Sequence, residues 1–254
     1  MLVAITRPVP EAISECALTY MSREPIDYDL AAGQHEDYVR LLQQLEASSV
    51  SLASTPQLPD SAFVEDTAVV VDELAVMTRP RLPSRQAEIE SSRCVIQRYR
   101  PVTDLAGEGH LEGGDVLRLG RRLYVGLSSR TDADGIRGLE ERVAPHGYSV
   151  TAVPVDRCLH LKTACTSVGR NTLLLNPAWV SRAVFQDFNV IETPVTEPFS
   201  ANALLIGDTV VLPASFPEMA ERVRAQGFKV VTIEFTELMK AEAGLTCCSI
   251  LLEA

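Results

Sequence analysis

The segment Leu111-Glu-Gly-Gly-Asp-Val-Leu-Arg-Leu-Gly-Arg-Arg-Leu-Tyr-Val-Gly-Leu127 contains the pattern that decides the fold. Two short apolar runs are separated by a tight turn at Gly120-Arg-Arg, which is typical of an antiparallel β-hairpin. A carboxylate, Glu112, stands just before the first run. After the hairpin, residues 132–146 place apolar side chains on one helical face, and a strand is expected over 148–154. The segment therefore predicts a unit made of a hairpin, a helix and a further strand.

The same pattern recurs on both sides of this segment. Hairpins are predicted over 68–79, 165–175 and 202–212, each with its turn at Gly, Asp or Asn. Helices are predicted over 27–46 and over 217–226, where Pro217 begins the helix and Gly227 ends it. Strands are then expected near 50–52 and 228–235. The chain is thus predicted to repeat one small α/β unit.

Polar residues that precede the hairpins give the repeat its period. They lie 42 to 48 residues apart, a spacing of about one fifth of the chain, which favours a radial or stacked architecture. The last unit, Cys247 to Ala254, is too short alone and is expected to pair with the strand Leu2 to Thr6. The alternative is chance spacing of hairpins in an ordinary α/β chain. The marked positions are Glu65-Asp66, Glu112, His160, Asn202 and Cys247-Cys248.

A radial array would bring these marked positions together on its axis, although they are far apart in sequence. A thiol, an imidazole, an amide and several carboxylates would then share one site. This set offers a nucleophile, a base and acceptors suited to a cation.

Composition excludes several functions. The 254 residues carry 23 Lys and Arg against 34 Asp and Glu, a net charge of −11, which lacks the basic footprint of a nucleic-acid-binding protein and disfavours an anionic membrane surface. The 46% hydrophobic content excludes disorder. We find no zinc spacing of Cys and His, no signal peptide and no apolar run long enough to cross a membrane. A cytoplasmic protein with reduced thiols and no metal is expected.

Among the possible reactive groups, His160 is favoured over three other histidines, which are expected at the surface: His35, His110 and His146. Adjacent residues of a strand point to opposite faces, so only one of Cys247 and Cys248 is expected to reach the axis. The remaining cysteines are interpreted as small buried apolar residues: Cys16, Cys94, Cys158 and Cys165.

Five motifs occur in order: Pro59-Asp-Ser-Ala-Phe-Val-Glu-Asp-Thr67, Leu111-Glu-Gly-Gly-Asp115, Gly126-Leu-Ser-Ser-Arg-Thr131, Leu159-His-Leu-Lys-Thr163 and Gly244-Leu-Thr-Cys-Cys-Ser249. In these the chain resembles the dimethylarginine dimethylaminohydrolase family of the guanidino-group-modifying pentein superfamily. The resemblance covers nearly the whole chain. It implies a five-bladed, pseudo-symmetric αββαβ propeller that forms one catalytic domain over 1–254. It also implies no cofactor, because the related chemistry uses side chains alone.

The resemblance implies that Cys247 is the nucleophile and that His160 protonates the leaving amine and then activates water. Glu112 and Asp66 would accept hydrogen bonds from the substrate guanidinium, and Glu65 would lie near it. The expected reaction converts Nω-methylated arginine to citrulline and a methylamine through a covalent S-alkylthiouronium. Asp115 is expected to tie the Gly-Gly turn.

The other end of such a substrate carries a carboxylate and an ammonium. The resemblance assigns the carboxylate to Arg85 and Arg130, because arginine binds carboxylates bidentately. Four further residues complete the expected contacts with the small cationic guanidino substrate. Leu18 in a mobile loop and Ala241 would offer backbone carbonyls, Phe63 would pack on the aliphatic stem, and Asp60 would lie near the amino-acid end.

The chain departs from the family pattern at two places. Glu242-Ala243-Gly244 lacks the expected Gly-Gly pair, and the loop at Glu15-Cys16-Ala17 has no glycine. Both touch the amino-acid end of the substrate, so other guanidino-modifying activities stay open, among them arginine deiminase, amidinotransferase, citrulline hydrolase and hydroxyarginine hydrolase. A non-catalytic guanidino-binding protein and a purely structural α/β protein are further alternatives. A homodimer is possible, and the sequence does not decide it.

Overall fold

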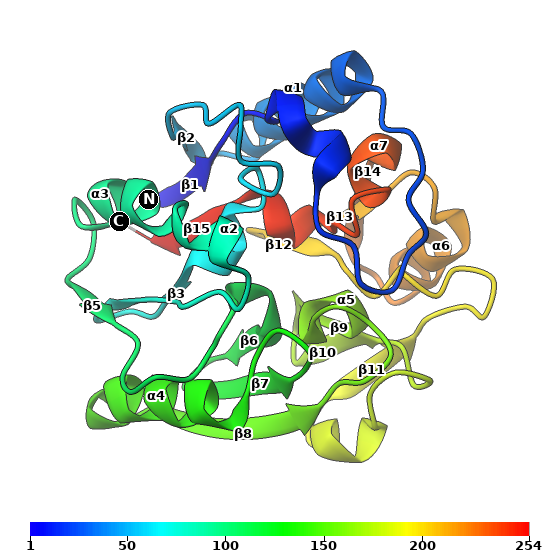
Figure 1. Ribbon diagram of the computed structural model, residues 1–254. Coiled ribbons are helices and arrows are strands. Elements are labelled where there is room, and N and C mark those ends of the chain that lie inside the picture. The colour runs from blue at the N-terminus through cyan, green and yellow to red at the C-terminus, as the bar shows by residue number, and fades with distance from the viewer. Residues whose placement is uncertain (254) are drawn as a thin grey trace.

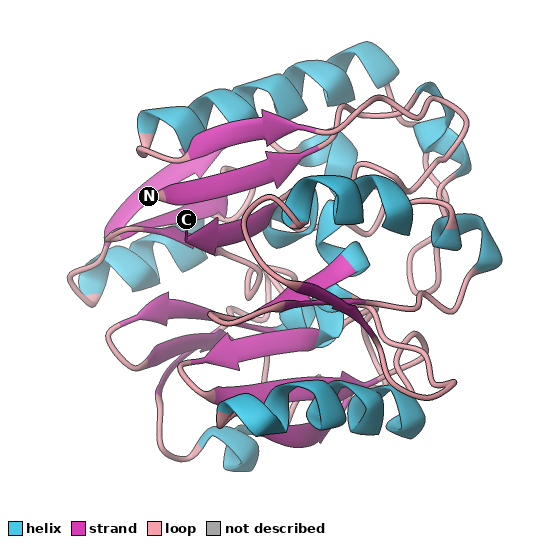
Figure 2. Cartoon of the chain, turned by 90° about the vertical axis from the view of Figure 1, so that its left-hand side faces the viewer, coloured by secondary structure: helices cyan, strands magenta, loops and turns pink. Residues whose placement is uncertain are grey.

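Five three-stranded sheets are arranged around a common centre in the computed structural model, which describes residues 1–253 (Figures 1 and 2). Ala254, the last residue of the predicted closing unit, lies outside the described residues. In each sheet the middle strand pairs antiparallel with one neighbour and parallel with the other. The fold is the predicted five-unit α/β propeller.

The sheets are, in chain order, β3 (Ala68–Val70), β4 (Ala75–Met77) and β5 (Val102–Asp104); β6 (Val116–Leu119), β7 (Arg122–Leu127) and β8 (Ser149–Pro154); β9 (Cys165–Gly169), β10 (Thr172–Leu175) and β11 (Asn189–Glu192); β12 (Leu204–Ile206), β13 (Thr209–Pro213) and β14 (Lys229–Ile233); and β15 (Ile250–Glu253), β1 (Leu2–Thr6) and β2 (Ser48–Ser51). The α-helices are α1 (Tyr28–Gln44), α2 (Pro83–Gln86), α3 (Ile89–Ile96), α4 (Ala133–Val143), α5 (Leu161–Ala164), α6 (Pro217–Ala225) and α7 (Thr236–Met239).

The fifth sheet closes the ring with strands from both ends of the chain. Leu2 pairs with Glu253 and Ile5 with Ile250, so β15 pairs with β1 as the sequence predicted, and the pairing is antiparallel. The N and C labels accordingly lie close together in Figure 1.

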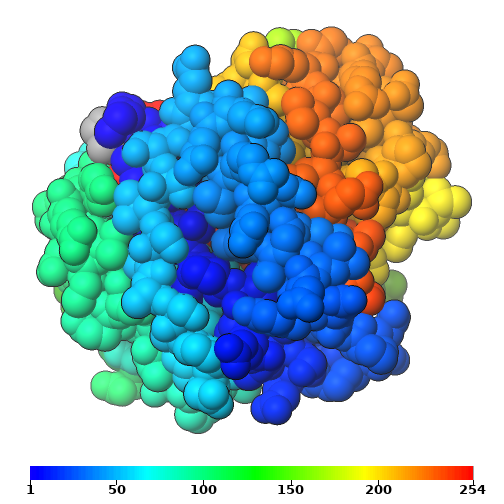
Figure 3. All heavy atoms as spheres, turned by 90° about the horizontal axis from the view of Figure 1, so that it is seen from above, coloured from blue at the N-terminus to red at the C-terminus, as the bar shows by residue number. Residues whose placement is uncertain are grey.

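The longer helices cover the outside of the ring and bury one face each. In α4, Ile136, Leu139 and Val143 are buried as the periodicity predicted. In α1, Gln34 donates to Thr236 and accepts from the backbone N–H of Glu237 at the start of α7. Figure 3 shows these two segments side by side on the upper surface. The apolar core is correspondingly divided into five clusters.

Short helical turns lead into three of the hairpins and into β15, and we call them the leading turns. They are η2 (Val64–Thr67), η3 (Gly113–Asp115), α5, and η6 (Leu245–Cys248). Other 3-10 turns occur at η1 (Glu11–Glu15), η4 (Ala144–His146) and η5 (Arg182–Phe185). The marked polar residues lie on two of these turns (Glu65, Asp66, Cys247 and Cys248) or directly before the other two (Glu112 and His160), whereas Asn202 lies on none of them.

Two expectations about surface residues were wrong. His35 is buried in α1, and burial lowers the pKa of its imidazole to about 4. Cys94 is exposed on α3, whereas Cys16, Cys158 and Cys165 are buried as expected. The sequence patterns did not predict α2, α3 or β5, which complete the unit that begins with β3 and β4.

Candidate active site

A small enclosed pocket of about 320 Å³ lies where the leading turns meet. Nine of the eleven sequence-predicted site residues line it, and only Leu18 and Glu65 do not. Four lining residues were not predicted: Ala17, Leu159, Glu242 and Ala243. The predicted residues that line the pocket are Asp60, Phe63, Asp66, Arg85, Glu112, Arg130, His160, Ala241 and Cys247.

His160 stands directly before α5, where Asp115 fixes the backbone. Asp115 accepts the N–H of Leu161 at 2.9 Å and the hydroxyl of Ser128 at 2.7 Å. It therefore ties the histidine turn to the neighbouring unit. Asp115 is also the last residue of the Gly-Gly turn η3, but the carboxylate that accepts the N–H of Gly114 is that of Asp66. A Cβ on Gly114 would lie 2.6 Å from His160 Nδ1, so this close approach requires glycine.

The imidazole of His160 is buried among carboxylates. Its Nε2 lies 2.8 Å from Glu112 Oε2 and 3.9 Å from Asp66 Oδ1. Burial alone would lower its pKa, but Asp66, Asp115 and Glu112 outweigh that effect and raise the pKa to about 9. The ring is thus protonated at neutral pH and can donate a proton inside the pocket.

Glu112 is fully buried and uses only one of its oxygens for a hydrogen bond. Oε2 accepts from His160, whereas Oε1 has no hydrogen-bond partner among residues 1–253 and lies 3.6 Å from Arg130 Nη1. A buried carboxylate oxygen without a donor is costly. It therefore marks a place where a cationic N–H group would be stabilised.

Asp66 and Arg85 form the most tightly bonded part of the pocket. Asp66 accepts from Arg85 Nη1 at 2.6 Å and from the N–H of Gly114 at 2.8 Å. Arg85 also donates to Glu88 and to the carbonyls of Asp60 and Phe63. Both side chains are thus occupied by protein partners, and their predicted contacts with a substrate stay predictions.

Three side chains of the pocket have donor atoms close enough to hold a metal ion. One atom each of Asp66, Glu112 and His160 lies within 4.8 Å of the others. Arg85 Nη1, however, is 2.6 Å from Asp66 Oδ2 and 3.9 Å from Glu112 Oε2, and it already supplies a positive charge there. The set therefore fits a hydrogen-bonded acid and base better than a metal centre.

The two adjacent cysteines have different surroundings. They lie on the 3-10 turn η6, not on a strand as expected, yet they still face different ways. Cys248 is fully buried in an apolar cluster, whereas Cys247 is half-buried and lines the pocket. Burial, with the nearby carboxylates of Glu65 and Asp66, raises the pKa of the Cys247 thiol to about 12. A cation in the pocket would oppose that shift.

Glu65 lies outside the pocket and anchors the turn that carries Cys247. Its carboxylate accepts from Lys162 Nζ and from the hydroxyl of Thr246, the latter at 2.8 Å. Asn202, another marked residue, donates to Thr246 Oγ1 and accepts the N–H of Thr246. Lys162 and Thr246 belong to the quoted motifs, but nothing in their sequence context indicated this role.

The rim of the pocket is formed by the segment Ala17–Glu24, which we call the rim loop. The N–H of Ala17 donates to Asp60 Oδ1 at 3.1 Å, and Arg130 Nη2 donates to Thr19 Oγ1 at 3.2 Å. Leu18 is half-buried within this loop. The loop therefore rests on two side chains that were predicted to bind the amino-acid end of a substrate.

A ring of five αββαβ units with Cys, His and Glu at its axis defines the class of guanidino-modifying pentein proteins. The sequence profile of the family described as arginine deiminase matches residues 28–199. Among curated relatives, the N(G),N(G)-dimethylarginine dimethylaminohydrolase of Pseudomonas aeruginosa is 35% identical over 88% of this chain and 89% of its own length. The enzyme of the same name from Streptomyces coelicolor is 34% identical over 97% of this chain and 95% of its own length. The chain belongs to the dimethylarginine dimethylaminohydrolase family.

Solved structures agree with this family. The Pseudomonas aeruginosa enzyme, as a cysteine-to-serine mutant complexed with citrulline, superposes with a TM-score of 0.94 at 33% identity, covering 98% of each chain. A dimethylarginine dimethylaminohydrolase adduct with S-methyl-L-thiocitrulline, in a histidine-to-glycine variant, also has a TM-score of 0.94 at 32% identity, covering 99% of this chain and all of that one. In the described part of this chain, no helix has both the length and the apolar character needed to span a bilayer.

Proposed function

We propose that the protein hydrolyses Nω-methylated arginines to citrulline and a methylamine. The observation that carries this proposal is Oε1 of Glu112, which accepts no hydrogen bond from the described residues and shares one small pocket with His160 and Cys247. A guanidinium that donates to this oxygen would place its carbon near the sulfur. The names of the relatives, and the citrulline and thiocitrulline in the neighbouring structures, support the same reaction.

In the first half of the proposed reaction, binding of the guanidinium lowers the pKa of Cys247, and the thiol proton passes to water. The thiolate attacks the guanidinium carbon and forms a C–S bond. The C–N bond to the methylated nitrogen then breaks, while protonated His160 donates its proton to that nitrogen. A neutral methylamine leaves, and an S-alkylthiouronium cation remains on Cys247.

In the second half, the roles of the side chains are reversed. His160, now neutral, takes a proton from water, and the resulting hydroxide attacks the same carbon. The C–S bond breaks, which returns the thiolate and leaves the ureido group of citrulline after loss of one proton to solvent. Glu112 keeps His160 oriented and its positive charge balanced through the hydrogen bond at 2.8 Å.

The amino-acid end of the substrate is proposed to bind at the rim. Arg130 and Arg85 would contact its carboxylate, Asp60 its ammonium, and Phe63 its aliphatic stem. Backbone carbonyls of Leu18 and Ala241 would complete the ammonium site. All of these residues except Leu18 line the pocket, which supports the assignment.

The test is incubation of the purified protein with asymmetric dimethylarginine, with citrulline and dimethylamine measured together. Equal amounts of the two products are expected. A parallel panel of monomethylarginine, arginine, hydroxyarginine and citrulline identifies the leaving group. Ammonia release from arginine, without methylamine release from methylarginines, would instead favour a deiminase, an alternative that the arginine deiminase family match also supports. Release of no product from any of these substrates would reject the proposed activity.

A further inference from the structure

Glu242 is in an unusual backbone conformation. Its φ is 57°, in the left-handed region that non-glycine residues rarely adopt, and it stands where the family pattern led us to expect glycine. Such a conformation persists only when surrounding contacts hold it in place. The contacts of Glu242 are therefore the place to look for its role.

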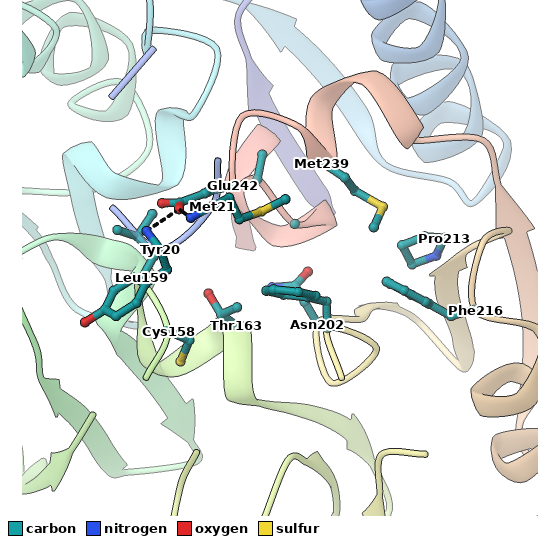
Figure 4. A pocket seen from close by; sticks show the side chains of 13 residues that line it. Tyr20, Met21, Cys158, Leu159, Thr163, Asn202, Pro213, Phe216, Met239 and Glu242 are labelled. Atoms are coloured by element: carbon teal, nitrogen blue, oxygen red, sulfur yellow. Dashed lines mark hydrogen bonds between the residues drawn. The ribbon is translucent and has the colours of Figure 1, made fainter. Parts of the chain in front are cut away.

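The carboxylate of Glu242 binds the rim loop through three successive backbone N–H groups. Oε2 accepts from Thr19 at 3.0 Å, and Oε1 accepts from Tyr20 and from Met21. Figure 4 shows Glu242 beside Tyr20 and Met21, and dashed lines there mark hydrogen bonds between the residues drawn, which do not include Thr19. Successive N–H groups that converge on one anion form a concave binding site, and hydrogen bonds to a charged acceptor are the stronger kind.

The position of Glu242 connects the rim loop with the catalytic pocket. Its side chain lines that pocket together with Ala241 and Ala243. It also lines a neighbouring pocket of about 580 Å³, which is mostly apolar and includes Met21 and Tyr20. Glu242 thus forms part of the wall between the two cavities, and the rim loop closes over that wall.

Two other ties of the rim loop differ from that of Glu242 in one respect. Ala17 is tied to Asp60, and Thr19 to Arg130, both of which the proposed function assigns to the substrate. A bound substrate would compete with the loop for these two side chains. The proposed function gives Glu242 no contact with the substrate, so its three bonds to the rim loop can persist while substrate is bound.

We propose that Glu242 is a positioning residue that latches the rim loop over the catalytic pocket and so retains the substrate. This inference rests on the proposed function, since it assumes that a substrate occupies the pocket. The latch acts through the loop and not on the reacting atoms. It should therefore affect substrate retention more than the chemical step.

The experiment compares Glu242→Gly, Glu242→Gln and the unaltered protein by amide hydrogen exchange and by steady-state kinetics with asymmetric dimethylarginine. Glycine removes the acceptor and also suits the left-handed backbone, so this variant should fold. Glutamine keeps the side-chain volume and one acceptor oxygen, so its effect should be intermediate. Glu237→Gln is the matched control, because Glu237 accepts the N–H of Asp27 at 2.9 Å beyond the other end of the same loop.

In Glu242→Gly, exchange at Thr19, Tyr20 and Met21 should be about tenfold faster and KM should rise about tenfold, with kcat changed less than about twofold, because fewer molecules hold the loop closed. Glu237→Gln should leave exchange at these three amides unchanged. Unchanged exchange in Glu242→Gly would overturn the latch, as would faster exchange with an unchanged KM. Hydrogen exchange needs no turnover, so an inactive unaltered protein would reject the proposed function while the exchange data still decide whether the latch exists.

Discussion

The floor of the catalytic pocket and its rim are held together in different ways. On the floor, Asp66, Arg85 and Glu112 are buried and bonded mainly through side chains, in a network of charges shielded from water. At the rim, the loop around Thr19 and Tyr20 is exposed, and its ties use mainly its own backbone N–H groups. The proposed chemistry needs fixed distances between acid, base and sulfur, whereas passage of substrate needs a cover that can open. Changes on the floor should therefore have larger effects than changes at the rim.

The largest effect is expected for Cys247→Ser on the floor. Citrulline formation should fall by at least about 1000-fold with the fold intact, because a hydroxyl replaces the nucleophile. Citrulline assays and circular dichroism would measure the two properties. Cys248→Ala is the matched control, since its sulfur packs in the core, and it should retain activity while losing about 1–2 kcal/mol of stability. The opposite result, an active Cys247→Ser and an inactive Cys248→Ala, would move the nucleophile by one residue.

The next largest effect is expected for Arg85→Met. Loss of the guanidinium leaves the buried carboxylates of Asp66 and Glu88 without the cation that is hydrogen-bonded to both, so the free energy of unfolding should fall by about 3–5 kcal/mol. Urea unfolding followed by fluorescence gives this value. A loss of less than about 1 kcal/mol in the free energy of unfolding would mean that water screens the charges on the floor. The floor would then be no more firmly held than the rim.

A smaller effect is expected from pH. The pKa of His160 in the folded protein, about 9, lies above the ordinary value of 6.5, so the folded state binds this proton more tightly than the unfolded state. Its contribution to stability is complete below pH 6.5 and is lost as pH rises through 9, by on the order of 1–3 kcal/mol.

Urea unfolding at intervals between pH 6 and 9.5 would measure this loss, and His160→Gln should flatten it. Asp115, whose pKa burial raises to about 6, and His35, whose pKa burial lowers from 6.5 to about 4, affect stability at the lower edge of this window, so the loss due to His160 is taken from the points above about pH 7. A stability that rises between pH 6.5 and 9 in the unaltered protein would contradict the proposed charge of His160.

The smallest effect is expected at the rim. Arg23 is exposed and donates to the carbonyls of Ser14 and Cys16. Arg23→Met should change the free energy of unfolding by no more than about 0.5 kcal/mol, measured under the same urea conditions. A loss as large as that of Arg85→Met would show that the rim is as firmly built as the floor.

The ring could be predicted from the sequence because each hairpin leaves a pattern within a short stretch of the chain. Apolar runs around Gly120 and around Gly169-Arg170-Asn171 indicate hairpins, and their regular spacing indicates a closed array. The unit with the sheet β3, β4 and β5 was incomplete in that prediction, because α2 and β5 have only four and three residues and show little periodicity.

The sequence predicted which residues form the site better than it predicted the bonds between them. The repeat marked Glu112, His160 and the pair Cys247-Cys248, and the family resemblance chose Cys247 from that pair. The structure brings Glu112, His160 and Cys247 together in one pocket. The bonds between them could not be predicted, since Asp66 turns to Arg85 and Glu65 to Lys162 through packing between units. Glu242 shows the same limit, because the loop residues that it binds lie 221 to 223 positions earlier in the chain.

The pairing of β1 with β15 determines when the site can exist during folding. Cys247 lies on η6, directly before β15, and β15 is held in the ring by a strand from the opposite end of the chain. Contacts between such distant segments carry the largest entropy cost of loop closure and make folding slow. Four units can assemble from neighbouring segments, but the thiol reaches its place only when the two ends meet. We therefore expect assembly of the reactive centre to be a late event in folding, so that a chain whose ends have not met has no organised nucleophile.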